Sequence, residues 1–190
     1  SILEARELAA MFLFGEKVTL HSAHHFKTAA EHHQRLESLI RNSELVEYMQ
    51  GYNGDPHGKI SGIKTGNSGM SFTAANGNRI LFAARSSGSA RGFTADLVVF
   101  DEAFDLSRSA QASMLPTLAS KSLHESPQIW YTSSAGMPDS EVLKGLRDRA
   151  LSPEKEEKLA FYEWSVPSEA DPADPKNWAL ANPALGYRIS

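Results

Sequence analysis

Two adjacent carboxylates, Asp101 and Glu102, stand directly after the apolar run Leu97-Val98-Val99-Phe100. A continuous apolar run of this kind is typical of a buried parallel strand, and ligands of open α/β sheets bind at the carboxyl ends of such strands. In a Walker B motif the Asp helps to hold Mg²⁺, and the following Glu orients and deprotonates the attacking water. The alternative is a strand that ends in a solvated acidic turn, and so short a motif does not decide between the two.

Hydroxyl side chains follow the next predicted strand along the chain. Thr132, Ser133 and Ser134 come after the run Gln128-Ile129-Trp130-Tyr131. Short hydroxyl side chains at a strand end can sense a γ-phosphate or its water by hydrogen bonding, and they can pass its loss to a neighbouring element. Serine-rich strand ends are also common turn formers. The motif alone is therefore weak evidence, and its spacing from the acidic pair in the sequence strengthens the functional interpretation.

Arginines occupy a Gly/Ser-rich stretch before the acidic strand, at Arg85 and Arg91. The planar guanidinium donates hydrogen bonds in pairs, which suits the charge that develops on a transferring phosphoryl group. A surface loop with solvated arginines is the alternative.

At the N-terminus, Ser1 precedes a predicted helix, as the last residue of a phosphate-binding loop G-x-x-x-x-G-K-[ST] would. That loop motif itself does not occur in the sequence.

Histidines are concentrated near the N-terminus, where five of the seven fall between positions 21 and 33: His21, His24, His25, His32 and His33. His25 and either His32 or His33 could share one helix face two turns apart. A metal site more often pairs residues one turn apart and adds a carboxylate or a third ligand. We therefore predict that these histidines occupy surface positions of a helix and a loop.

The composition is that of one compact domain with an ordinary core. The chain has 190 residues, of which 41% are hydrophobic and 22% charged, and its net charge is -4. That charge argues against a protein that wraps nucleic acid over its whole surface, but it permits contact with DNA through one loop. The absence of cysteine excludes disulfides, thiolate zinc sites and a cysteine nucleophile. No apolar run is long enough to span a bilayer, and no signal peptide is evident. Separately, we expect the chain to be a fragment.

The elements that must position these residues alternate between helices and strands. Apolar periodicity and helix formers predict helices over residues 2–14, 26–41, 109–119 and 139–151. Short β-rich or apolar runs predict strands over residues 17–23, 97–100, 128–132 and 159–165. Asn76-Gly77 stands between two further runs, 70–74 and 78–84, and predicts a hairpin whose two central residues have positive φ. This order is typical of a sheet covered by helices.

Together these segments closely resemble the terminase large subunit of tailed bacteriophages, over nearly the whole chain and in the same motif order. The matching segments are residues 80–93, the Asp101-Glu102-Ala103 strand end, residues 131–136 and residues 174–186. The last of them contains Trp178 followed by Ala181-Asn182-Pro183-Ala184-Leu185-Gly186, an idiosyncratic pattern that has no general ATPase explanation.

The resemblance implies the fold and the domain organisation. The fold would be α/β, a RecA-like P-loop ATPase sandwich with a mainly parallel sheet and a β-hairpin insertion. Residues 1–166 would form a partial ATPase domain that lacks its Walker A loop. Residues 167–190 would be a linker toward a C-terminal nuclease domain that this sequence does not contain.

The resemblance also implies a chemistry that uses ATP and Mg²⁺. Asp101 would serve Mg²⁺ together with Ser1, the Walker A hydroxyl, and Glu102 would activate water. Arg91, eleven residues before Glu102, matches the arginine that the family uses as a finger, acting in trans between neighbouring subunits. Arg85 is the fallback for that role.

The coupling motif and the partners are implied in the same way. Thr132, Ser133 and Ser134 would link hydrolysis to DNA movement. The partners would be double-stranded DNA, the portal protein, the small terminase subunit and further copies of the chain in a ring. The location would be the host bacterial cytoplasm, transiently on the procapsid portal.

Two departures from the family pattern leave alternatives open: the Gly-rich loop with its Lys is missing, and so is the C-terminal nuclease domain with its acidic metal cluster. Without the Gly-rich loop and its Lys, binding of the β- and γ-phosphates should be badly weakened, and we expect the fragment to be inactive alone. An intein inside the Walker A motif or a truncated prophage gene would explain the start at Ser1. The rival functions are an Asp-Glu-Ala-type nucleic-acid helicase domain and a non-catalytic remnant that retains only subunit contacts. The Trp178 segment favours the terminase over the helicase.

Overall fold

The computed structural model describes residues 2–66, 69–85, 94–119, 126–154 and 158–187. The chain divides into two units, Ser1–Gly145 and Leu146–Ser190. The first unit holds a sheet with its covering helices, and the second holds a short helix and extended segments. The proposed boundary between residues 166 and 167 stays a prediction.

A six-stranded sheet forms the centre of the first unit, in the order β2-β3-β4-β1-β5-β6. Its strands are β1 (Val18–Ala23), β2 (Ile63–Lys64), β3 (Ser71–Thr73), β4 (Arg79–Ala84), β5 (Leu97–Phe100) and β6 (Gln128–Tyr131). β4, β1, β5 and β6 run parallel, whereas β3 is antiparallel to β4 and β2 is antiparallel to β3. This confirms the α/β class with a mainly parallel sheet. The carboxyl ends of the four parallel strands meet at one edge.

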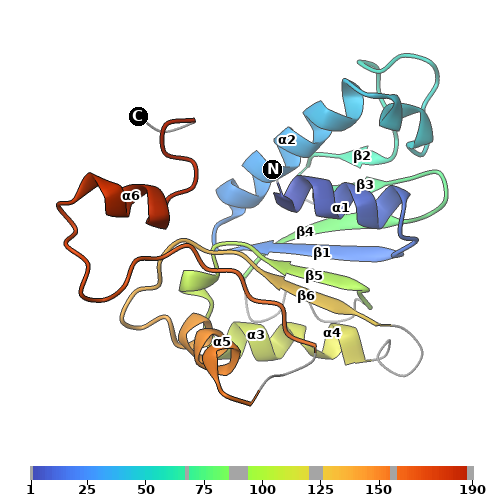
Figure 1. Cartoon of the computed structure of the whole chain (residues 1–190). Coiled ribbons are helices and arrows are strands. Elements are labelled where there is room, and N and C mark those ends of the chain that lie inside the picture. The colour runs from blue at the N-terminus through green and yellow to red at the C-terminus, as the bar shows by residue number, and fades with distance from the viewer. Residues whose placement is uncertain (1, 67–68, 86–93, 120–125, 155–157, 188–190) are drawn as a thin grey trace. The chain divides into compact units, whose positions relative to one another are not determined.

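Helices cover both faces of this sheet (Figure 1). α1 (Ile2–Phe12) and α2 (Phe26–Arg41) lie on one face, while α3 (Arg108–Met114) and α4 (Pro116–Ala119) lie on the other. The single helix expected over residues 109–119 is divided at Pro116, because proline lacks the N–H that a continuing helix needs. Two 3-10 helices, η1 (Glu44–Tyr48) and η2 (Ala103–Asp105), follow α2 and β5.

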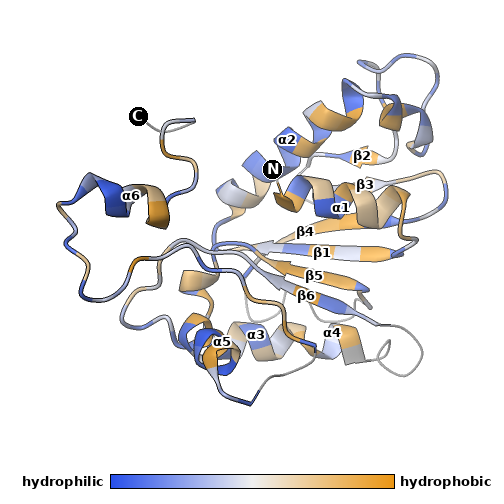
Figure 2. Ribbon diagram, viewed as in Figure 1, coloured by the Kyte–Doolittle hydropathy of each residue, from blue (hydrophilic) through white to orange (hydrophobic). Residues whose placement is uncertain are grey.

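Apolar side chains of the central strands form the core. All four residues of β5 are buried, as expected for a central parallel strand, and Figure 2 shows hydrophobic residues along β4 and β5. Leu97 and Val99 of β5 pack against Leu3 and Ala10 of α1. A larger cluster joins α1 and α2 to β3 and β4, and its largest fully buried members are Met11, Leu36, Ile40, Met49, Phe72 and Ile80. The sheet is therefore anchored to both helices on this face.

The predicted β-hairpin is confirmed, since β3 and β4 pair antiparallel, but its turn differs from the expected one. Gly77 has a φ of 89°, whereas Asn76 does not lie at positive φ. The N–H of Gly77 donates to the carbonyl of Ala74 at 2.9 Å, so residues 75–77 form a three-residue loop that ends in a left-handed glycine. The side chain of Asn76 accepts the N–H of Asn78 at 2.9 Å, which stabilises the loop.

The second unit contains no strand among its described residues. The strand predicted over residues 159–165 is therefore wrong, since that segment has no partner for a backbone ladder within its unit. The apolar residues that suggested a strand include Tyr162 and Trp164, and both are exposed. α5 (Glu141–Leu151) begins in the first unit and ends in the second.

A short helix, α6 (Pro175–Ala181), lies in the segment expected to be a linker. Asp174 caps this helix, since its Oδ1 accepts the N–H of Lys176 at 3.0 Å. The indole N–H of Trp178 donates to the carbonyl of Pro172 at 2.8 Å and ties the helix to the preceding loop. Among the described residues, no helix combines the length and the apolar character needed to cross a membrane.

Candidate functional site

Asp101 and Glu102 stand where β5 ends, at the carboxyl edge of the sheet. The N–H of Asp101 donates to the carbonyl of Ser22, near the end of the neighbouring strand β1, at 3.0 Å. This bond continues the parallel ladder by one residue and fixes the start of the loop after β5. Both acidic residues are partly exposed, so a ligand can reach them from solvent.

Thr132 comes from the end of β6, the other neighbour of β5, and contacts the acidic pair directly. Its Oγ1 donates to Oδ1 of Asp101 at 2.8 Å. Its carbonyl accepts the N–H of Ala103 at 2.9 Å. Ser133 and Ser134 follow at exposed positions. The structure therefore brings together the acidic strand end and the first hydroxyl of the motif that the sequence singled out.

Glu102 has a backbone conformation that L-residues rarely adopt. Its φ of 53° and ψ of 50° lie in the left-handed region, and it is the one non-glycine residue at positive φ among those described. Such a conformation costs on the order of 1–3 kcal/mol and is found mainly at functional sites. The N–H of Glu102 donates to Oδ1 of Asp101 at 3.0 Å. That oxygen thus accepts two hydrogen bonds, which hold the Asp101 carboxylate in place.

Arg85 follows β4 directly, and its guanidinium reaches the same strand ends. Nη1 donates to the carbonyl of Glu102 at 3.1 Å, and Nη2 donates to the carbonyls of Ser22 at 3.4 Å and of Asp101. Burial lowers the pKa of Arg85, while the carboxylates of Glu102, Asp101 and Asp105 raise it. The cation is thus held by backbone carbonyl groups of its own chain. Arg91 and Ser1, the other two candidate residues, lie outside the described residues.

One further ion pair at this edge was missed by the sequence analysis. Nδ1 of His24 lies 2.9 Å from Oδ2 of Asp105, and both side chains are partly exposed. His24 is the first residue after β1, and Asp105 is the last of η2. The signal that could have identified His24 is its place at the carboxyl end of a predicted parallel strand, the same rule that singled out Asp101.

Comparison with solved structures identifies the fold. The crystal structure of the HK97 bacteriophage large terminase matches with a TM-score of 0.79 at 19% identity, over 100% of this chain and 37% of that chain. The ATPase domain of the large terminase from Thermus phage P74-26 matches with a TM-score of 0.54 at 14% identity, over 82% of this chain and 61% of that chain. This chain has the fold of a large-terminase ATPase domain. Neither a protein-family model nor a curated protein matches the sequence.

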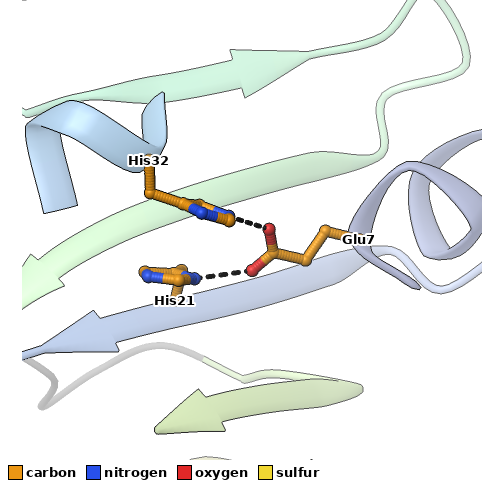
Figure 3. Close-up of side chains that lie close together, drawn as sticks. All are labelled: Glu7, His21 and His32. Carbon is orange, nitrogen blue, oxygen red and sulfur yellow. Dashed lines mark hydrogen bonds and ion pairs between the residues drawn. The ribbon is translucent and has the colours of Figure 1, made fainter. Parts of the chain in front are cut away.

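This terminase-like fold also encloses a buried cluster of three polar residues from α1, β1 and α2: Glu7, His21 and His32 (Figure 3). The Glu7 carboxylate accepts from Nδ1 of His21 at 2.7 Å and from Nε2 of His32 at 2.6 Å. The predicted surface position is wrong for these two histidines and for His33, all of which are at most 1% exposed. His25, in contrast, is exposed.

The surface prediction failed for His32 and His33 because both lie on the buried face of α2. That face runs through Ala29, Leu36 and Ile40 at helical spacing, and His32 and His33 fill the turn between them. The His33 ring stacks on Phe72 with centroids 4.3 Å apart and an interplanar angle of 14°. The imidazole of His33 therefore packs in the core much as an aromatic ring does. The apolar stripe was readable from the sequence and could have indicated that these histidines are buried.

The buried cluster is a carboxylate hydrogen-bonded to two imidazoles, and its geometry does not suit a metal ion. Burial alone would raise the pKa of Glu7, but His21 and His32 lower it to about 2. One ligand atom of each residue lies within 4.8 Å of the others, and two histidines with a carboxylate are a known ligand set for zinc or iron. However, the two imidazoles stack with centroids 4.2 Å apart and an interplanar angle of 13°. Lone pairs in two nearly parallel, stacked planes do not converge on one ion.

Proposed function

We propose that this chain is the ATPase motor portion of a phage terminase large subunit, which couples ATP hydrolysis to translocation of viral double-stranded DNA into the procapsid. The observation that carries the proposal is the hydrogen bond from Thr132 to Asp101, beside Glu102, in a chain with the fold of a large-terminase ATPase domain. This bond joins an acidic strand end suited to hydrolysis to a hydroxyl-bearing strand end suited to sensing its outcome.

The residues at this edge fit a hydrated Mg²⁺ ion. Mg²⁺ prefers oxygen ligands and keeps several of its waters, so a single carboxylate with a hydroxyl is a common protein contribution. Within the described residues, hydrogen bonds engage Oδ1 of Asp101, and Oδ2 is the oxygen that would contact the ion or its water. Ser1 would supply the hydroxyl. When bound, Mg²⁺ neutralises the charge that develops on the transferring phosphate.

Glu102 would hold and deprotonate the water that attacks the γ-phosphate. Its N–H is bound by Asp101 and its carbonyl by Arg85, so the side chain starts from a fixed point at the strand end. Arg91 would act in trans on the site of a neighbouring subunit. Thr132, with the two serines after it, would respond to loss of the γ-phosphate, because its hydroxyl already contacts the Asp101 carboxylate.

We further propose the partners of a packaging motor. These are double-stranded DNA, the portal protein, the small terminase subunit and further copies of the chain in a ring, in the host bacterial cytoplasm and transiently on the procapsid portal. The chain spans 37% of the HK97 large terminase in the structural match, so these activities would belong to a longer protein. A net charge of -4 suits DNA contact through a limited surface of each copy.

The proposal is tested by ATP hydrolysis. The chain is compared with a version that carries a strand and a Gly-x-x-x-x-Gly-Lys loop before Ser1. Only the extended version should turn over. Glu102→Gln in that version should lower kcat by about 10²- to 10⁴-fold, the usual contribution of a general base. Glu31→Gln, at an exposed position of α2, is the matched control and should leave kcat unchanged.

Other outcomes would assign a different function. If both versions fold but neither binds nor hydrolyses ATP, the motor assignment is wrong, and a non-catalytic remnant becomes the better interpretation. ATP-dependent strand separation by the extended version would favour the Asp-Glu-Ala-type helicase. A Glu102→Gln variant with full activity would remove the proposed role of Glu102 while leaving the fold assignment intact.

A further inference from the structure

We propose that Arg85 is a positioning residue that acts within its own chain: by binding the peptide carbonyl of Glu102, it holds the backbone from which the Glu102 carboxylate projects toward the reacting water. The inference rests on the proposed function of Asp101 and Glu102. It replaces the fallback role of Arg85 as an arginine finger.

The contacts of Arg85 join three strand ends. Its own N–H donates to the carbonyl of Ala23 at 3.1 Å and continues the pairing of β4 with β1. Its two Nη atoms donate to the carbonyls of Ser22, Asp101 and Glu102. The planar fork of a guanidinium can bind several acceptors at once, which the single ammonium group of lysine cannot do in the same geometry. Arg85 therefore fastens the loop after β5 to the ends of β1 and β4.

The loop that Arg85 binds needs such support. Glu102 has a φ of 53°, and an L-residue keeps this conformation only when its surroundings impose it. Both polar groups of its backbone are bound. Its N–H donates to Oδ1 of Asp101 at 3.0 Å, and its carbonyl accepts from Nη1 of Arg85 at 3.1 Å and from the N–H of Asp105 at 3.2 Å. Without Arg85, only the short turn to Asp105 holds this carbonyl, and we expect the Glu102 peptide to return to an ordinary conformation. The direction of its side chain would then change.

The charge of Arg85 is only partly compensated inside the site. Burial lowers its pKa, and the carboxylates of Glu102, Asp101 and Asp105 oppose that effect without outweighing it. Nε of Arg85 is buried without a partner among the described residues. A buried donor without a partner is costly, so the carbonyl contacts of the two Nη atoms must offset this cost.

This geometry is inconsistent with a finger that serves a neighbouring subunit. A finger must present free donor groups at the surface, toward phosphate oxygens in another copy. The Nη donors of Arg85 instead point at the backbone of its own chain. Arg85 therefore supports the site from within, and the proposed role in trans is left to Arg91.

The first test compares Arg85→Lys and Arg85→Gln with the parent in the version of the chain that carries the phosphate loop. We expect kcat to fall by about 10- to 100-fold, because small misplacements of a catalytic group have effects of this size. KM for ATP should change by less than about threefold, since the phosphate-binding groups of this mechanism are untouched. Arg79→Lys, at an exposed position of β4, the strand that precedes Arg85, is the matched control and should behave as the parent. An unchanged kcat in both Arg85 variants would overturn the proposal, and so would failure of both variants to fold.

The second test separates action in cis from action in trans. Arg85→Gln subunits are mixed with Glu102→Gln subunits under conditions where the parent assembles. If Arg85 acts in trans, some sites in the mixture regain both groups and activity recovers. If it acts in cis, every site lacks one of the two groups and no activity returns. Recovery would therefore overturn the proposal.

A structural readout keeps this inference distinct from the proposed function. In a crystal structure of Arg85→Lys, the φ of Glu102 should leave the left-handed region. If the parent hydrolyses no ATP, the proposed function fails, yet this measurement still tests the positioning role. If the parent is active and Glu102 in Arg85→Lys keeps its positive φ, the proposed function stands and the positioning role is wrong.

Discussion

The carboxylate of Glu7 is expected to be a major contributor to stability at neutral pH, and Glu7→Gln removes its charge while keeping its shape. The side chain is fully buried and accepts hydrogen bonds from His21 and His32 at 2.7 and 2.6 Å. These bonds connect α1 and α2 to the central strand β1. The substitution leaves one carbonyl oxygen as an acceptor and places an amide against the other histidine, so one of the two charge-assisted bonds is lost and the other is weakened.

The size of the effect follows from the pKa of Glu7. That pKa is lowered from an ordinary value of 4.5 to about 2 by the two histidines, against the effect of burial. At about 1.4 kcal/mol for each pH unit, a difference of about 2.5 corresponds to about 3 kcal/mol of stability at pH 7. Breaking a buried ion pair by removing one partner costs roughly 3–5 kcal/mol in other proteins, in agreement with this figure.

The pH dependence has a definite sign. Because the pKa of Glu7 is lower in the folded state than in the unfolded state, its contribution is fully present above pH 4.5. The contribution is lost as the pH falls from 4.5 toward 2. Urea unfolding of the parent and of Glu7→Gln at pH 7, 5 and 3 should therefore show a difference of about 3 kcal/mol at the two higher pH values and roughly half of it at pH 3.

Glu31→Gln is the control for this measurement, because Glu31 lies at an exposed position of α2. Its effect should stay within about 0.5 kcal/mol at every pH. Equal stability of Glu7→Gln and the parent at pH 7 would refute the reasoning. A difference that grows as the pH falls below 4.5 would refute it too, since a carboxylate with a lowered pKa loses its contribution in that range.

Four further outcomes are expected. Thr132→Val removes the hydroxyl that donates to Asp101 at 2.8 Å; urea unfolding should show a loss of about 1 kcal/mol, as for a typical hydrogen bond. Gly62→Ala places a Cβ 2.3 Å from the carbonyl oxygen of Thr73 and should lower stability by about 1–3 kcal/mol. Gly145→Ala, which meets no atom within 4 Å in α5, should raise it by up to about 1 kcal/mol. Added Zn²⁺ should not raise the unfolding midpoint, because the stacked histidines of the buried cluster cannot both turn toward one ion.

The acidic strand end was predictable because the pattern that signals it is local. Four consecutive apolar residues must be buried on both faces, which places them in the centre of a parallel sheet, and the residues after them must then emerge at its carboxyl edge. The same argument applied to Thr132, since β5 and β6 are neighbours both in sequence order and in the sheet. The strand predicted over residues 159–165 fails for the complementary reason. The apolar run that suggested it was local too, but a strand requires a partner, and no local pattern supplies one.

The apolar stripe of α2 could have indicated that His32 is buried, but its pairing with Glu7 and the role of Arg85 were not predictable, because each depends on contacts between distant segments. Glu7 meets His32 across 25 positions of sequence, and the burial of a histidine depends on whether a carboxylate arrives to satisfy it. An arginine at position 85 suits either role, that of a finger or that of a positioning residue, so the residue type alone does not distinguish them. Its contact with Ser22, 63 positions away, and the left-handed backbone of Glu102 distinguish the two. The placement of the acidic and hydroxyl residues at this edge was thus readable from the sequence, whereas the proposed assignment of Arg85 to its own chain required knowing which carbonyl groups lie within reach of its donors.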